Sequence, residues 1–144
     1  MQKSNKTLLI VLATVSVLFV GLIVLAILAA IALPAYQSYV SRARVSQALV
    51  MATTASHQVS AYVLEHDRIP ASLAEAGFEM TPEASIQSIS LDPYTAQIQV
   101  TLSGSAQIDG KSLLLTPSKN GSGEVAWQCV NGDVPQSLLP SQCR

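Results

Sequence analysis

The sequence predicts an α+β fold in which a long, kinked N-terminal helix, membrane-spanning in its first half, packs on a four-stranded antiparallel sheet that ends in a C-terminal disulfide loop. Three observations predict it. Residues 8–33 contain no charged side chain. The hydrophobic period then changes from steps of three and four in residues 45–63 to alternation in residues 86–129. The two cysteines lie late in the chain. A helix covering one face of a sheet is the simplest arrangement that buries both apolar faces.

The apolar run is the first element. At 1.5 Å per residue, residues 8–33 would reach nearly 40 Å, which exceeds a hydrocarbon core of about 30 Å. We therefore expect a membrane-spanning helix. The alternative is a cleavable secretory signal, because Lys3 and Lys6 precede the run and Ala30-Ile31-Ala32 resembles a cleavage site. The run is longer than the roughly 7–15 apolar residues of a signal peptide, which favours the spanning helix.

The helix is expected to continue past the membrane segment. Pro34 lacks a backbone N–H and should kink it without ending it. Residues 35–66 then show one apolar face and one polar face, typical of a helix that covers a core. The apolar face consists of Val45, Leu49, Ala52, Val59 and Val63. The protruding apolar half needs lipid or other helices around it. We expect two parts, residues 1–33 with the cytoplasmic tip and transmembrane half, and a globular domain of residues 34–144.

The remaining elements are short. Residues 67–84 contain Pro70, Gly77 and Pro82, which predicts a loop with one helical turn at residues 72–76. Apolar alternation predicts strands at residues 86–91, 98–102, 113–115 and 125–129, the third closed by Pro117. A turn at residues 118–123 would join the last two strands as antiparallel neighbours.

The cysteines favour one orientation in the membrane. Basic residues flank both ends of the apolar run, so charge does not decide it. Cys129 and Cys143 are an even pair without Cys-x-x-Cys spacing, which suits a structural disulfide in an oxidising compartment. The alternative is two free buried thiols in a cytoplasmic domain, which would reverse the topology. We expect the N-terminus in the cytoplasm and the globular domain outside it.

Residues 22–49, LIVLAILAAIALPAYQSYVSRARVSQAL, carry a family resemblance. They resemble the N-terminal helix of type IV pilins, and the W-x-C followed by L-P-S-x-C-R at the end is similar to the C-terminal disulfide loop of that family. The resemblance implies a structural subunit of a type IV pilus or pilin-like filament, used in adhesion, twitching motility or DNA uptake in natural competence. It implies no enzymatic activity and no cofactor. The implied partners are other pilin subunits in a helical filament, the pilus assembly machinery, and membrane lipid before assembly.

The resemblance also implies where the chain resides and which residues act. It implies a single-pass protein of the bacterial inner membrane with its globular domain in the periplasm, and a cell-surface pilus once assembled. It implies a disulfide between Cys129 and Cys143 and a helix kink at Pro34. Eight residues are expected to contact other subunits or the membrane: Ile27, Leu28, Ile31, Leu33, Tyr36, Tyr39, Arg42 and Arg44.

The chain departs from the family pattern upstream. The family has a glycine before the mature start and a glutamate five residues into the mature helix. Counting back from Pro34 places Leu12 at the glycine, Ala13 at the mature start and Val17 at the glutamate, and no acidic residue precedes Glu65. The second hypothesis is therefore an uncleaved single-pass pilin-like protein that regulates or assists the pilus machinery.

Catalytic and ligand-binding patterns are weak. His57 and His66 lie nine residues apart on the predicted helix, which does not align them as ligands, and no Gly-x-Ser-x-Gly, phosphate-loop or zinc spacing occurs. Eight Lys and Arg against nine Asp and Glu give no basic field that would attract nucleic acid. A small basic patch of Lys111, Lys119 and Arg144 is the basis of a third hypothesis, a DNA or surface receptor.

Overall fold

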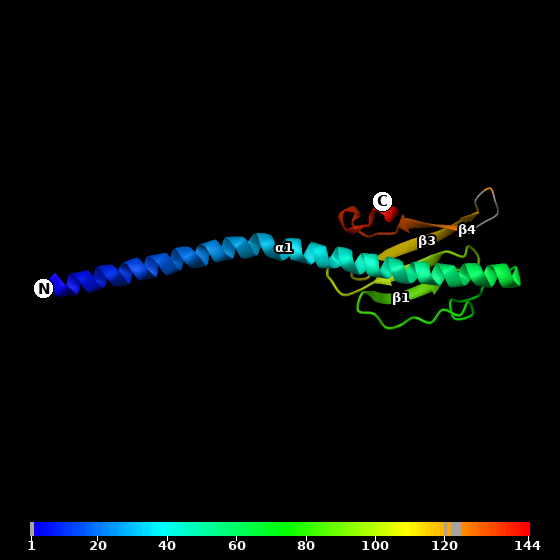
Figure 1. Ribbon diagram of the computed structural model, residues 1–144, viewed down its shortest axis with the longest axis horizontal. Helices are drawn as coiled ribbons and strands as arrows, with labels where there is room; N and C mark the ends of the chain where they lie inside the picture. The colour runs from blue at the N-terminus through cyan, green and yellow to red at the C-terminus, as the bar shows by residue number, and fades with distance from the viewer. Residues whose placement is uncertain (1, 120, 122–124) are drawn as a thin grey trace. The chain divides into compact units, whose positions relative to one another are not determined.

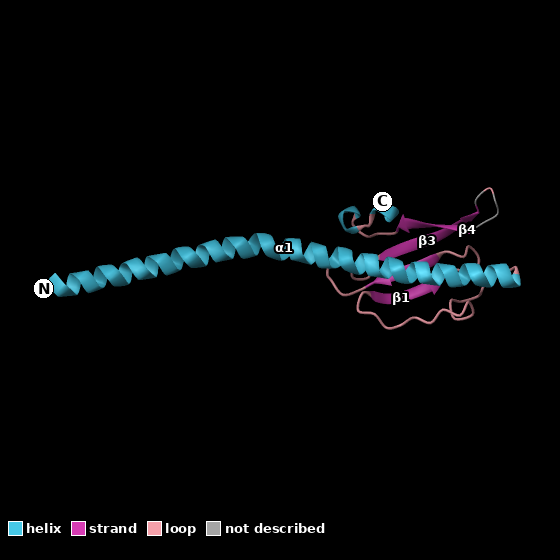
Figure 2. Cartoon of the chain, in the orientation of Figure 1, coloured by secondary structure: helices cyan, strands magenta, loops and turns pink. Residues whose placement is uncertain are grey.

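The computed structural model describes residues 2–119, 121 and 125–144. Within them the chain forms a long helix followed by a four-stranded sheet and two short 3₁₀ turns (Figures 1 and 2). The elements are α1 (Gln2–His66), β1 (Ile86–Leu91), β2 (Ile98–Leu102), β3 (Ser112–Lys119), β4 (Val125–Asn131), η1 (Gln136–Leu138) and η2 (Ser141–Cys143). Two compact units divide after Gln37. We call Met1–Gln37 the stem and Ser38–Arg144 the head.

The stem is the N-terminal part of α1, and its residues 8–33 carry no charged side chain. Every side chain from residue 5 to residue 37 is exposed. Among the described residues, one helix is long and apolar enough to cross a membrane, and none of its most apolar window is buried. The helix continues through Pro34, as the sequence predicts, while the kink there stays a prediction.

Within the head, α1 buries one face. The buried positions recur at steps of three and four, which confirms the predicted amphipathic helix. They are Ser41, Val45, Ala48, Leu49, Ala52, Ala55, Ser56, Val59 and Tyr62.

The sheet has the order β1-β2-β3-β4 with every neighbouring pair antiparallel. Its inner face is built by alternation, since Ile98, Val100 and Leu102 on β2 are all fully buried and the residues between them are not. Leu113 and Leu115 continue the core on β3. Buried residues of the helix and the strands form one hydrophobic core, and Figure 1 shows α1 running along the sheet. The predicted α+β fold is confirmed.

The predicted end of the third strand is wrong. The strand does not close at Pro117 but continues to Lys119, with Pro117 opposite Trp127 of β4. The pairing of β3 with β2 stops at Leu115, so Pro117 lies where β3 has a partner on one side only. A missing N–H is tolerated there because no ladder with β2 needs it. The predicted turn at residues 118–123 lies partly outside the described residues.

The loop between α1 and β1 contains one helical turn at residues 72–76, as the sequence predicts. The backbone N–H of Ala76 donates to Ser72 at 3.3 Å and that of Phe78 to Leu73 at 2.9 Å. Gly77 ends the turn with φ 78°, a conformation that glycine adopts without strain. The buried side chains of Leu73, Ala76 and Phe78 hold the turn against the core.

Candidate functional site

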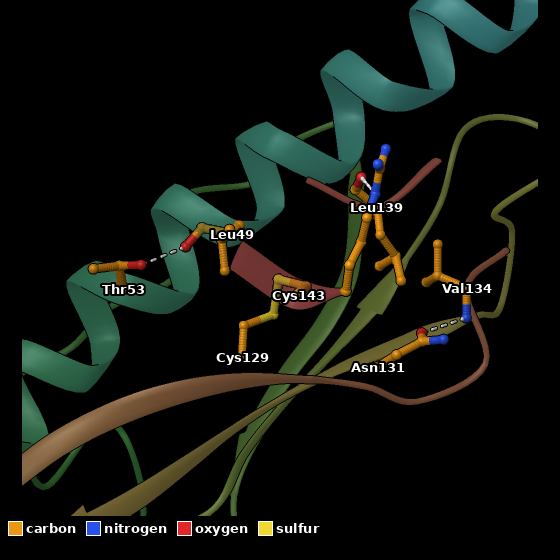
Figure 3. The surroundings of a disulfide bond; sticks show 8 residues. Leu49, Thr53, Cys129, Asn131, Val134, Leu139 and Cys143 are labelled. Atoms are coloured by element: carbon orange, nitrogen blue, oxygen red, sulfur yellow. Dashed lines mark hydrogen bonds between the residues drawn. A yellow bond between two sulfur atoms is a disulfide. The ribbon is translucent and has the colours of Figure 1, made fainter. Parts of the chain in front are cut away.

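A disulfide joins the last strand to the end of the chain. Cys129 of β4 is bonded to Cys143 of η2 with the Cα atoms 4.8 Å apart, which confirms the predicted bond (Figure 3). Figure 3 places Leu49 of α1 beside the sulfur atoms. Between the two cysteines the tail buries Val134, Leu138 and Leu139. The tail therefore packs on the head through apolar contacts as well as through the covalent bond.

Polar contacts fix the start of this tail. The backbone N–H of Val134 donates to the side-chain oxygen of Asn131 at 3.1 Å. The carboxylate of Asp133 accepts hydrogen bonds from the backbone N–H and the hydroxyl of Ser112, and these donors lower the pKa of Asp133. These hydrogen bonds fix the backbone of residues 131–134, where the tail leaves β4.

The two arginines expected to contact lipid or neighbouring subunits lie against loops of the head. Arg42 is exposed, and its Nε donates to the carbonyl of Ser137 in the tail at 2.9 Å. Arg44 is half-buried, and its buried Nη1 has no hydrogen-bond partner among the described residues. It lies beside Gly104, where an added Cβ would be 2.5 Å from that nitrogen. Both arginine side chains therefore lie against other residues of the head.

The other predicted contact residues are outward-facing. Ile27, Leu28, Ile31 and Leu33 of the stem have 55%, 58%, 67% and 59% of their surface exposed. Tyr36 of the stem and Tyr39 of the head are exposed by 67% and 72%. These six side chains are available for contact with another molecule.

A polar network lies at the C-terminal end of α1, which ends at His66. The carboxylate of Glu75 accepts hydrogen bonds from the Tyr62 hydroxyl and the Ala71 backbone N–H, both at 2.6 Å, and from Arg68. These three donors, the tyrosine hydroxyl foremost, lower the pKa of Glu75 to about 2. His66 stacks on the Tyr62 ring with 4.1 Å between centroids. The network ties residues 68–75 to the last helical turns.

An apolar cavity of about 220 Å³ opens beside the same end of α1. It is lined by the last turns of α1, the segment that follows it, the β1–β2 loop and the facing ends of β3 and β4. The lining includes Val59, Val63, Ile69, Ala96, Val125 and Trp127. The indole Nε1 of Trp127 donates to Ser60 at 2.8 Å, which fixes the ring at the cavity wall.

The predicted basic patch is not formed. Lys111 immediately precedes β3, whereas Lys119 is its last residue. With about 3.4 Å per residue, their Cα atoms are roughly 27 Å apart. Arg144 donates to the carbonyl of Leu139 at 3.2 Å, within the tail. The lysines are therefore too far apart along the strand to form one compact basic cluster, and the nucleic-acid hypothesis loses that support.

Sequence reasoning missed the Glu75 network and the apolar cavity. Glu75 lies in a loop whose composition predicts only a turn, and its partners come from α1 and from the loop itself. The cavity residues come from four separate segments. No sequence spacing brings these together. The charged stretch Glu65 to Arg68 at the helix exit was the one available signal.

Comparisons with known proteins agree on one family. A family model described as pilin, a bacterial filament protein, matches residues 41–144. The fimbrial protein of Neisseria meningitidis serogroup B is 33% identical, with 88% of this chain and 89% of the relative covered. The fimbrial protein EcpC of Eikenella corrodens is 34% identical over 88% of this chain and 86% of its own length. The type IV major pilin protein PilE of Neisseria gonorrhoeae is 35% identical over 88% and 89%. Together with the long apolar helix, the four-stranded sheet and the C-terminal disulfide, these matches show that the chain belongs to the pilin family of bacterial filament proteins.

Proposed function

We propose that this chain is a structural subunit of a type IV pilus and that it packs into the filament through the apolar stem. The exposure of the stem carries the proposal. Full burial of a Leu, Ile, Val or Phe side chain contributes about 1.5–3 kcal/mol, and the stem exposes more than a dozen of them. Such a surface is stable only in lipid or against other apolar helices. A filament subunit uses both, lipid before assembly and equivalent stems afterwards.

The same proposal sets the orientation and the partners. The disulfide supports a head in an oxidising compartment, which for a bacterial inner-membrane protein is the periplasm. The stem would then be extracted from the membrane by the pilus assembly machinery. A subunit of this kind works by packing rather than by chemistry, so we propose no enzymatic activity.

No acidic residue precedes Glu65, and this determines which charges the packed stems would have to bury. The resemblance implies a glutamate that compensates a neighbouring amine within the apolar filament core. Val17 occupies that position here and is 71% exposed. The uncharged residues 8–33 of the stem can therefore pack without burying a carboxylate.

Recovery of the chain from surface filaments tests the proposal. Filaments are sheared from cells, collected by centrifugation and analysed by mass spectrometry, with the membrane fraction measured in parallel. Ile27→Asp should abolish recovery from filaments, because a carboxylate would be buried between stems, while the membrane still contains the protein. Gln87→Asp, at an exposed position of β1, is the matched control and should leave recovery unchanged.

The alternative role, a membrane-bound protein beside the pilus machinery, predicts that the wild-type chain stays in the membrane fraction. If wild-type chain is retained in the membrane and absent from sheared filaments, the filament-subunit proposal fails and a role beside the pilus machinery is favoured. Intact mass of the membrane form, measured in the same experiment, reports whether the stem is cleaved upstream of Pro34.

A further inference from the structure

The side of α1 that faces away from the sheet in the head carries no Lys, Arg, Asp or Glu. Its side chains recur at steps of three and four, on the opposite side of the helix from the buried positions. Three of them are large and strongly exposed, Tyr39 by 72%, Val50 by 67% and Leu64 by 84%. We call this surface the outer face, and it consists of Tyr39, Ala43, Ser46, Val50, Thr54, His57, Ala61 and Leu64.

The stem of a second copy matches the outer face in length and in charge. α1 runs from the stem into the head as one helix, so the outer face follows directly on the surface through which the stem is proposed to pack. Residues 8–33 of the stem and residues 39–64 of the outer face are equally long, about 39 Å at 1.5 Å per residue. In the proposed orientation the head lies outside the membrane, where lipid does not cover it. A neighbouring stem is an uncharged apolar helix that can cover it.

His57 lies on the outer face without a partner. Its side chain is exposed, and it makes no hydrogen bond or ion pair with any residue that the structure describes. Glu65, the nearest charged residue along the helix, is eight positions away, about 12 Å along the axis. The partly or fully exposed residues within one turn of His57 are all uncharged, namely Thr53, Thr54, Gln58, Ser60 and Ala61.

Other elements supply no counter-ion to His57. On the side toward β4, the described lining of the groove between α1 and β4 contains no charged side chain. On the side toward the segment after α1, Glu75 and Arg68 are paired with each other. A neighbouring stem would add residues 8–33, which carry no charge. A protonated His57 would therefore meet only uncharged groups in this contact.

The other histidine lies off the outer face. The chain has two histidines. His66 is the last residue of α1, where its ring stacks on Tyr62 and its Nδ1 lies 3.1 Å from the Tyr62 carbonyl oxygen. Histidine is the side chain that ordinarily gains its charge between pH 8 and pH 5. Acidification over this range therefore adds one charge to the outer face and one outside it.

We propose that the stem of a second copy packs along the outer face and that protonation of His57 opposes this contact, so that the filament is less stable at acid pH. The inference rests on the proposed function as a filament subunit and deepens it by naming a pH-sensitive contact. An imidazolium without a hydrogen-bond partner loses its hydration against an apolar helix, whereas a neutral imidazole loses much less. The contact is therefore complete at pH 7.5 and weakens as the pH falls through the range in which histidine gains a proton.

Dissociation of sheared filaments tests the pH dependence. Filaments are incubated in mild detergent at pH 7.5 or pH 5 and pelleted, and the released chain is measured in the supernatant. Wild-type filaments should release about tenfold more chain at pH 5, because each contact then holds an unpaired charge. His57→Gln should remove this difference, while His66→Gln, the matched control, should keep it. Equal release of the wild type at both pH values, a difference retained in His57→Gln, or a difference lost in His66→Gln would each overturn the proposal.

A permanent charge gives the same test at one pH. His57→Lys should lower filament recovery at pH 7.5 by about tenfold, while Gln87→Lys, at an exposed position of β1, should leave it unchanged. Membrane levels and the absence of free thiols verify that both variants fold. Full recovery of His57→Lys would show that the outer face is not covered.

Photo-crosslinking tests which surface covers the outer face. A benzoylphenylalanine placed at position 50 should crosslink to residues 8–33 of another copy in sheared filaments, and one placed at position 87 should not. Crosslinks from position 50 to another head, to a different protein or to lipid, or equal crosslinking from both positions, would overturn the inference while leaving the filament proposal intact. Absence of the wild-type chain from filaments would instead overturn both.

Discussion

The structure predicts how much the C-terminal disulfide contributes to the free energy of unfolding. The bond closes a loop between residues 14 positions apart. The chain-entropy relation gives a stabilisation of about 3 kcal/mol for a loop of about 15 residues. The double substitution Cys129→Ala and Cys143→Ala should therefore lower the free energy of unfolding by about this amount, a substantial share of the 5–15 kcal/mol typical of a domain.

The structure also predicts where the tail loosens first. Val134, Leu138 and Leu139 are buried and should hold residues 134–139 without the bond, whereas residues 140–144 bury only Cys143. Hydrogen exchange at the backbone amide of residue 143, which in the intact protein donates to the Pro140 carbonyl at 3.0 Å, should rise before exchange at the Leu138 amide.

Denaturant titration and hydrogen exchange of the full chain in detergent measure both quantities. Wild-type protein with the disulfide reduced is the matched control, because it lacks the bond but keeps both side chains. A loss below about 1 kcal/mol in both forms would refute the entropic reasoning. A uniform rise in exchange across residues 134–144 would refute the assignment of local anchoring to the buried leucines.

Three further predictions concern the head. Glu75→Gln should loosen residues 68–75. Folding lowers the pKa of Glu75 from 4.5 to about 2. The carboxylate therefore contributes to the free energy of unfolding above pH 4.5, and this contribution is lost as the pH falls toward 2. Acid titration of unfolding should therefore show a weaker pH dependence in the variant, and an unchanged profile would contradict the network. Gly104→Ala should cost about 1–3 kcal/mol, since φ is 95° and the new Cβ would lie 2.6 Å from a backbone oxygen, while Gly121→Ala, with open space around it, is the control and should change thermal stability little. Trp127→Phe removes the indole hydrogen bond to Ser60 and should cost about 1 kcal/mol by denaturant titration; a neutral result would show that the bond contributes no net stability.

Local patterns predicted most of the fold because the helix and strand periods are strong in this chain. The apolar face at Val45, Leu49 and Val59 and the alternation at Ile98, Val100 and Leu102 each specify one element and one buried face. The strand through Pro117 was mispredicted because a proline is unfavourable in a paired strand unless one neighbour is absent. That absence is a property of the sheet, which local sequence does not contain.

The candidate contact residues likewise fall into those whose surroundings the sequence predicted and those whose surroundings it did not. The exposure of Ile27, Leu28, Ile31 and Leu33 could be predicted directly, since a run without charge is apolar on every side, while their contacts stay a prediction. The arginines could not be placed, because whether a cation meets lipid or a loop depends on which carbonyls the fold brings near it. Arg42 meets a carbonyl 95 residues away in the chain. Contacts of that range arise only when the tail has folded back.

The sequence alone determined that this protein has an apolar stem, a helix that covers an antiparallel sheet, and a pair of cysteines suited to a terminal disulfide. Periodicity, the absence of charge and cysteine spacing are local properties, and each limits the backbone by itself. The tertiary structure alone decided that Glu75 binds residues at the C-terminal end of α1, that Arg42 meets the tail, and that four segments line an apolar cavity. These features depend on the distances between residues remote in the chain, which are fixed when the core packs.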